Sequence, residues 1–121
     1  MALTIQKIKK RKERRKKVLA RDLESITRQL VRMGAQKILL FGSYAEGIIR
    51  SWSDLDIIAV MPSTRTGKEW MGKIYDEIER NVACDILAFT HEELEKQIPL
   101  SRFLRYALEN GRVIHETGSE G

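Results

Sequence analysis

The segment Phe41–Val60, FGSYAEGIIRSWSDLDIIAV, decides the fold of this chain of 121 residues. It begins with a Gly42-Ser43 pair, continues for ten residues, and reaches Asp54-Leu55-Asp56. The four residues that follow, at positions 57–60, are all apolar and mostly β-branched, which predicts a buried strand. The segment therefore predicts a turn and an acidic pair held between two strands.

The acidic pair at the start of the predicted strand indicates a metal site. Side chains of a strand point alternately to its two faces, so Asp54 and Asp56 share a face and Leu55 occupies the other. Two carboxylates side by side repel each other, and a cation between them removes that repulsion. Oxygen ligands suit Mg²⁺ or Mn²⁺, the usual partners of nucleotide phosphates. Taken alone, an Asp-x-Asp pair is also typical of a solvated strand end or a helix cap.

The Gly42-Ser43 pair follows a predicted strand at positions 37–41. Glycine allows the backbone to come close to a ligand because it has no Cβ. If Tyr44 begins a short helix that Gly47 ends, the free N–H groups of its first turn can face an anion. The turn is therefore a candidate for binding triphosphate, although a lone Gly-Ser is also an ordinary connection between strand and helix.

A third acid, Asp85, interrupts the otherwise apolar run at positions 82–89, which predicts another strand. A buried carboxylate without a partner is costly. A salt bridge or a position at an exposed strand end would remove that cost. Alternatively, Asp85 lies beside Asp54 and Asp56 on a neighbouring strand and shares their cation.

The stretch GSYAEGIIRSWSDLDIIAV resembles the signature of the DNA polymerase β-type nucleotidyltransferase superfamily. Within it, the short chain resembles the minimal nucleotidyltransferases, which are the MNT-type antitoxins of HEPN/MNT toxin–antitoxin pairs. The resemblance covers positions 38–89 and continues more weakly to Glu116. It implies an α+β fold with a mixed β-sheet packed by helices.

The resemblance also implies an activity and a site. The activity is transfer of AMP from ATP to a hydroxyl, in the antitoxins a tyrosine hydroxyl of a HEPN-type toxin partner. Two Mg²⁺ ions would be held by the three acids, with the third acid helping to accept the proton of the attacking hydroxyl. The implied metal ligands and catalytic residues are Asp54, Asp56 and Asp85, and the implied nucleotide-binding residues are Gly42, Ser43, Arg50 and Ser53.

The positive charge of the chain is concentrated near its N-terminus. The segment Lys7–Lys17 has nine Lys or Arg and one Glu, a net charge of +8, whereas the whole chain has a net charge of +5. We therefore divide the chain into a basic arm, residues 1–17, and a nucleotidyltransferase domain, residues 18–121. Like charges repel and favour a frayed, solvated segment. The arm is either a solvated helical extension or a binding site for RNA, DNA or another polyanion.

The remaining segments predict helices around the sheet. Apolar residues at helical spacing from Leu19 to Met33 predict an amphipathic helix, which more commonly packs on a sheet than forms a coiled coil. Capping boxes begin at Thr66 and Thr90, before two further helices.

A nucleobase could stack on Trp52 or Trp70. Because Trp70 is in phase with an apolar helix face, it is predicted to lie in the core, and Trp52 is the better candidate for exposure.

Composition excludes several classes of protein. With 42% hydrophobic and 32% charged residues the chain is neither disordered nor membranous, and no apolar run approaches the roughly 18 residues of a membrane span. A single cysteine fits a cytoplasmic protein without disulfides.

One domain leaves little room for an acceptor site, so we expect another protein or a homo-oligomer to complete it. A non-catalytic antitoxin and an RNA-binding module remain alternatives.

Overall fold

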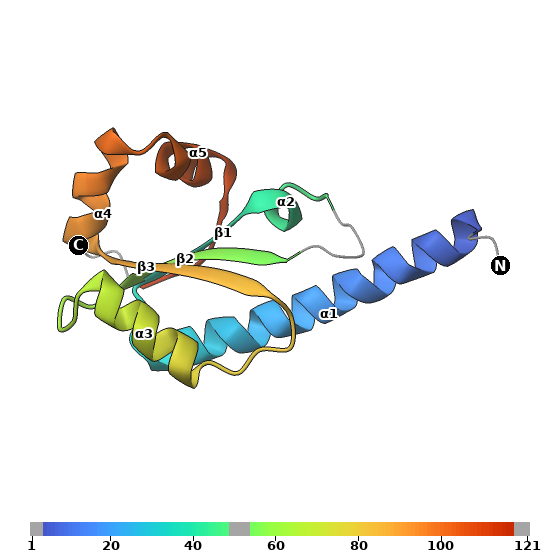
Figure 1. The fold of residues 1–121 in the computed structure, drawn as a ribbon, viewed down its shortest axis with the longest axis horizontal. Helices are drawn as coiled ribbons and strands as arrows, with labels where there is room; N and C mark the ends of the chain where they lie inside the picture. The colour runs from blue at the N-terminus through green and yellow to red at the C-terminus, as the bar shows by residue number, and fades with distance from the viewer. Residues whose placement is uncertain (1–3, 49–53, 118–121) are drawn as a thin grey trace.

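The computed structural model describes residues 4–48 and 54–117 and forms an α+β fold (Figure 1). Four strands make one mixed sheet, and helices cover both of its faces. The fold class predicted from the sequence is confirmed. In chain order the elements are α1 (Ile5–Arg32), β1 (Lys37–Phe41), α2 (Gly42–Ala45), β2 (Leu55–Met61), α3 (Gly67–Glu77), β3 (Cys84–Thr90), α4 (His91–Gln97), the 3₁₀ helix η1 (Ile98–Leu100), α5 (Arg102–Asn110) and β4 (Arg112–Glu116).

The strand order is β3-β2-β1-β4. Strand β1 runs antiparallel to both β2 and β4, whereas β2 and β3 are parallel and are connected through α3. A parallel pair requires such a crossover, because the chain must return to the same end of the sheet. As a result, β2 and β3 begin at the same end of the sheet. The acids near the starts of these two strands therefore also lie at that end.

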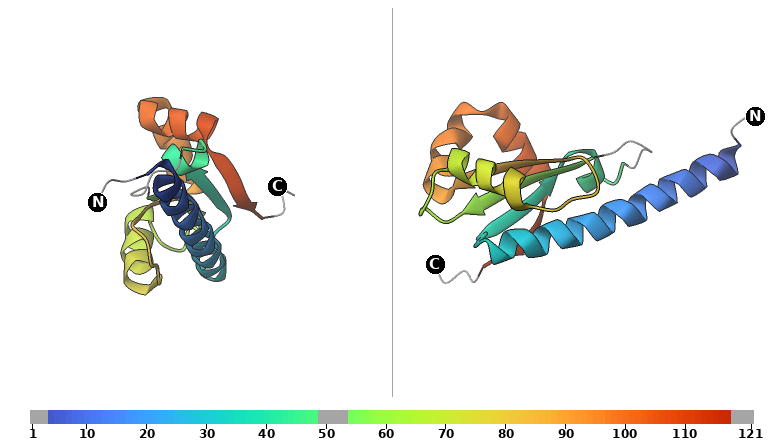
Figure 2. Two further views of the ribbon diagram at one scale, coloured as in Figure 1. Left: turned by 90° about the vertical axis from the view of Figure 1, so that its right-hand side faces the viewer. Right: turned by 60° about the horizontal axis from the view of Figure 1, so that its bottom comes forward.

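Each face of the sheet has its own apolar core. On one face, Leu19, Ile26 and Leu30 of α1 and Trp70 and Ile74 of α3 pack on alternate residues of β1, β2 and β3. On the other face, Leu94 of α4 and the α5 residues Leu104 and Ala107 pack on the intervening strand residues. Figure 2 shows the two groups of helices on opposite sides of the strands. The apolar stripe of α1 therefore packs on the sheet, as expected.

Helix α1 is continuous from Ile5 to Arg32. Its buried residues begin at Leu19, and the turns before it project beyond the strands (Figures 1 and 2). The basic arm is therefore a helical extension with no break near residue 17. The helical extension, one of the two alternatives for the arm, is therefore present. Lys and Arg are good helix formers, and the Thr4 side chain caps the first turn by accepting from the N–H of Lys7.

Both predicted capping boxes are present, at Thr66 with Glu69 and at Thr90 with Glu93. Trp70 lies in the core, as predicted, and its indole N–H donates to the carbonyl of Pro62 at 2.8 Å. Helix α3 ends at Glu77, and the following residue, Ile78, has an extended backbone. None of the helices in the described parts of the chain is long and apolar enough to cross a membrane.

Candidate active site

Three acidic residues lie near the ends at which β2 and β3 begin. Asp56 is the second residue of β2, and its register partner across the parallel pair is Asp85, the second residue of β3. Asp54 precedes β2 by one residue. Because equal register on parallel strands puts both side chains on one face, Asp85 lies beside Asp56. Asp85 is also exposed near the start of its strand, so the alternative of an exposed strand end stays open.

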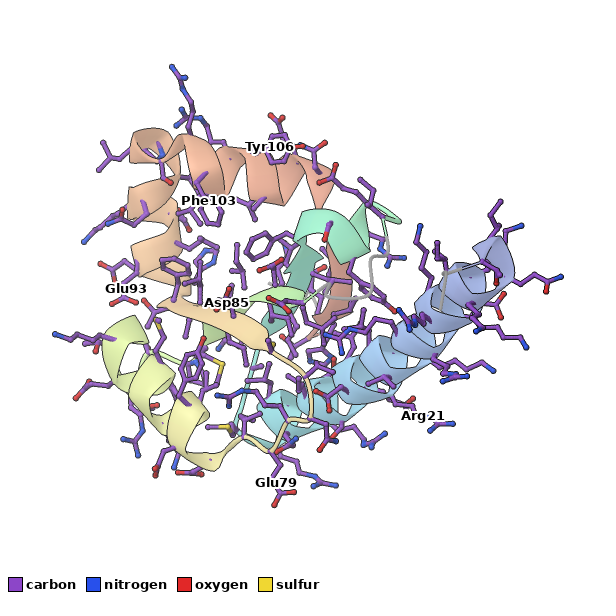
Figure 3. All side chains as sticks on the ribbon, turned by 45° about the vertical axis from the view of Figure 1, so that its right-hand side comes forward. Arg21, Glu79, Asp85, Glu93, Phe103 and Tyr106 are labelled. Atoms are coloured by element: carbon purple, nitrogen blue, oxygen red, sulfur yellow. The ribbon has the colours of Figure 1, made fainter. Side chains whose placement is uncertain are left out.

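The face on which these acids lie is the one covered by α4 and α5. Further along β2, Ile58 and Val60 alternate with the same phase as Asp56 and pack against those helices. At the acid end this cover stops, so Asp85 is exposed and Asp56 is half-buried. Figure 3 shows Asp85 on the side of the sheet toward α5. A ligand can therefore reach the acids from solvent.

Asp56 is the carboxylate with the perturbed ionisation. Its pKa is raised, first because burial disfavours the charged form, and then because the negative charges of Asp85 and Asp54 lie nearby. No residue of the described segments donates a hydrogen bond to the Asp56 carboxylate, so nothing there offsets that repulsion. Such a perturbed group in an accessible position is typical of a functional site.

The Gly42-Ser43 turn lies against Asp56. Phe41, the last residue of β1, is the register partner of Asp56, and Gly42 follows with a φ of +82°. A Cβ atom at Gly42 would collide with Oδ2 of Asp56. Both the left-handed backbone and the close approach thus require glycine. The two features predicted from the sequence are therefore adjacent in space.

The three acids have the oxygen chemistry that Mg²⁺ requires. Within residues 4–48 and 54–117, however, no three His, Cys, Asp or Glu side chains converge closely enough to hold one ion. The donor set fits the ion chemically, and Asp54 and Asp85 are exposed to solvent. A metal on these residues is a prediction from carboxylate chemistry and from the repulsion that raises the pKa of Asp56.

Sequence reasoning missed Arg15 of α1. Its Nη2 lies 4.0 Å from Oδ1 of Asp54. The basic arm thus brings a cationic side chain to the acids, 39 positions away in the chain. No signal in the sequence predicts this pairing, because it depends on the direction in which α1 crosses the sheet.

Three predicted residues, Arg50, Ser53 and Trp52, lie outside the described residues. A cavity of about 380 Å³ occurs at the other end of the sheet, between Thr66, Thr90, Arg65 and Lys96. It contains none of the predicted site residues. The candidate active site is therefore at the acids and the glycine turn, which carry the carboxylate groups and the close backbone approach that nucleotidyl transfer needs.

The mixed sheet, the glycine turn and the acids on adjacent strands define a palm domain of the nucleotidyltransferase type. The chain belongs to the family described as "Poly(A) RNA polymerase, mitochondrial-like, central palm domain", whose model matches residues 2–115. This family supports the nucleotidyltransferase superfamily named from the motif, and it does not support the MNT antitoxin type.

A crystal structure from Sulfolobus solfataricus, provisionally described as a nucleotidyltransferase, has 17% sequence identity and a TM-score of 0.49, with 91% of this chain and 87% of the other covered. No curated protein matches the chain significantly.

Proposed function

We propose that this chain transfers AMP from ATP to a hydroxyl acceptor. The observation that carries the proposal is the placement of Gly42, Asp56 and Asp85 on three adjacent segments, with Asp56 in contact with the glycine and in register with Asp85. Membership of a palm-domain family supports nucleotidyl transfer in general. The donor, the acceptor and the role of each residue are our proposal.

We assign a separate role in the reaction to each residue of the site. Asp54, Asp56 and Asp85 would hold Mg²⁺, which would neutralise phosphate charge and lower the pKa of the acceptor hydroxyl. Gly42 lets the triphosphate approach Asp56 without a side chain in the way. The acceptor oxygen bonds to the α-phosphorus, the bond to the β-phosphate breaks, and pyrophosphate leaves. Exposed Asp85 helps to accept the proton and passes it to water.

The acceptor that we propose first is the 3′-hydroxyl of an RNA strand. The matching family is named for RNA polymerases, and α1 presents the Lys7–Lys17 charges on a helix that reaches the acids through Arg15. A strand lying along this helix exchanges its counterions for Lys and Arg side chains. In this proposal the 3′ end of the strand lies near Asp54, where Arg15 of the same helix contacts the acids.

The second candidate acceptor is a tyrosine hydroxyl on a HEPN-type toxin partner. The observation in its favour is the motif Gly42–Val60, which resembles that of the minimal antitoxin nucleotidyltransferases. The same α1 surface then binds an acidic protein. If no transfer occurs with either acceptor, the chain acts by binding alone, as a non-catalytic antitoxin or an RNA-binding module.

The test combines labelled ATP, Mg²⁺ and two acceptors: an oligoribonucleotide and a purified HEPN-type toxin. We expect pyrophosphate release and extension of the oligoribonucleotide, and no extension when its 3′-hydroxyl is replaced by hydrogen. Asp54→Asn and Asp56→Asn should each abolish both signals. Full activity of Asp56→Asn would refute the proposal. Labelling of the toxin in place of the RNA would select the second acceptor.

A matched pair of variants tests the arm. Changing Lys9, Lys10, Arg11 and Lys12 to Gln removes four positive charges from the exposed part of α1. We expect weaker RNA binding and a shallower salt dependence, because fewer counterions are released. The control changes Arg65, Lys68, Lys96 and Arg102 to Gln, which removes four positive charges from exposed residues outside α1. Equal RNA affinity of the two variants would remove RNA from the proposal.

A further inference from the structure

Phe103 faces the sheet from α5 and yet is 53% exposed. Its neighbour on the helix, Leu104, is buried in the α5 core. The Phe103 ring meets the Phe41 ring edge to face, with centroids 5.4 Å apart and planes at 81°. Figure 3 shows Phe103 on the side of α5 toward the sheet, whereas Tyr106 lies on the outer side. The space in front of Phe103 is therefore open to solvent.

That open space borders the acids. Phe41 is the register partner of Asp56, and Asp56 is the register partner of Asp85. Phe41 packs with the core under α5, so it shares a face with Asp56 and Asp85. A row of Phe41, Asp56 and Asp85 thus crosses three strands at one level, and Phe103 stands over the aromatic end of this row.

We propose that Phe103, supported by Phe41, is the platform on which the base of the donor nucleotide stacks. The inference rests on the proposed function, whose donor phosphates lie at Gly42 and Asp56. Phe41 is joined directly to Gly42, so the phosphate site and the platform are connected by one rigid strand end. The T-shaped contact fixes the orientation of the Phe103 ring and leaves much of it uncovered.

The platform explains an otherwise costly exposure. A phenylalanine that is half exposed keeps apolar area in water, and a flat base would remove part of that area. Stacking on an aromatic ring accepts every base, because every base has a π-face. The platform therefore supplies affinity for nucleotides and little choice among them, and we expect purine donors to bind only modestly better than pyrimidines.

The experiment measures binding of 2-aminopurine riboside triphosphate, whose fluorescence is quenched on stacking, to the full chain with Mg²⁺. Phe103→Leu keeps an apolar side chain over Phe41 and removes the aromatic face. We expect it to bind about 10-fold more weakly and to lose the quenching. Phe103→Trp should retain both. The matched control is Tyr106→Leu, at a residue of the same helix that is 57% exposed and points away.

The kinetic counterpart separates the inference from the proposed function. With an acceptor in excess, Phe103→Leu should raise the KM for ATP and leave kcat unchanged. Wild-type affinity and quenching in Phe103→Leu, or a change in the KM for the acceptor alone, would overturn the platform while transfer continues. Quenching that depends on Phe103 in a chain that releases no pyrophosphate would overturn the proposed function and retain the platform. If Phe103→Leu unfolds, loss of quenching in folded Phe103→Trp decides against the platform.

Discussion

Two acidic residues, Asp22 and Asp56, show how differently the same side chain is accommodated in one domain. Asp22, on α1, is buried and accepts hydrogen bonds from the backbone N–H groups of Asn81 and Val82 at 3.0–3.1 Å. Asp56 is less buried, but it faces two other acids and receives no hydrogen bond from the described residues. Donors around an acid indicate a structural role, and other acids around it indicate a site for a cation.

The largest expected effect is that of Asp56→Asn on activity. Removing a ligand of Mg²⁺ should lower kcat/KM for transfer by at least about a hundredfold, since metal-ion stabilisation is worth several kcal/mol. The same variant should be more stable than wild type at pH 7 in EDTA. The pKa of Asp56 is raised in the folded state, so its charged form costs stability above that pKa.

The pH dependence of this gain gives its check. Below the ordinary pKa of 3.8, Asp56 is protonated in both folded and unfolded chains, so the advantage of Asn should disappear. Urea unfolding at pH 7 and at pH 3 measures both free energies. A variant that is less stable than wild type at pH 7 would mean that Asp56 is held like Asp22.

The next largest effect is expected for Asp22→Ala on stability. The substitution leaves the N–H groups of Asn81 and Val82 without acceptors, at a cost on the order of 3 kcal/mol. Urea unfolding monitored by circular dichroism gives the value. The control is Glu24→Ala, at an exposed residue of the same helix that pairs with Arg28, and it should change stability by less than about 0.5 kcal/mol. Similar losses in the two variants would contradict the structural role of Asp22.

Gly42→Ala tests whether the backbone beside Asp56 is part of the active site, and Gly47→Ala is its matched control. Both glycines have a φ of +82°, so both variants carry a left-handed strain of about 1–2 kcal/mol. Only at Gly42 does the added Cβ meet Asp56; at Gly47 there is open space. We expect Gly42→Ala alone to reduce transfer beyond its loss of folded protein. Equal activity of the two folded variants would separate Gly42 from the site.

The last prediction concerns Cys84, which is buried at the start of β3. Burial raises the pKa of its thiol to about 12, and the charges of Asp22, Asp56 and Asp85 add to this, whereas Arg80 opposes it. The thiol thus stays protonated at pH 8, and iodoacetamide should react with the native chain at least about a hundredfold more slowly than in urea. Asp56→Asn should leave this protection intact, because burial is the larger cause. Rapid native alkylation would contradict it.

Much of the fold could be predicted from local patterns. Alternation in β2 placed Asp54 and Asp56 together, and capping boxes located the starts of α3 and α4. Element ends were less predictable, since α3 stops at Glu77 where the apolar pattern continues to Ile78. The basic arm, for which a helical extension was one of two alternatives, continues α1. Its helix propensity and its connection to buried Leu19 outweigh the charge repulsion.

The candidate site was predictable only in part, and the limit is physical. Gly42, Asp54 and Asp56 lie within one short segment, and Asp85 begins the next strand, so backbone alternation and strand pairing bring them together. The contacts of Arg15 with Asp54, Phe103 with Phe41 and Asp22 with Asn81 each join elements far apart in the chain. They depend on how α1 and α5 pack against the sheet, which no local pattern specifies. The sequence by itself therefore determines which residues form the reaction centre. Only the tertiary packing decides which cationic and aromatic residues lie beside it.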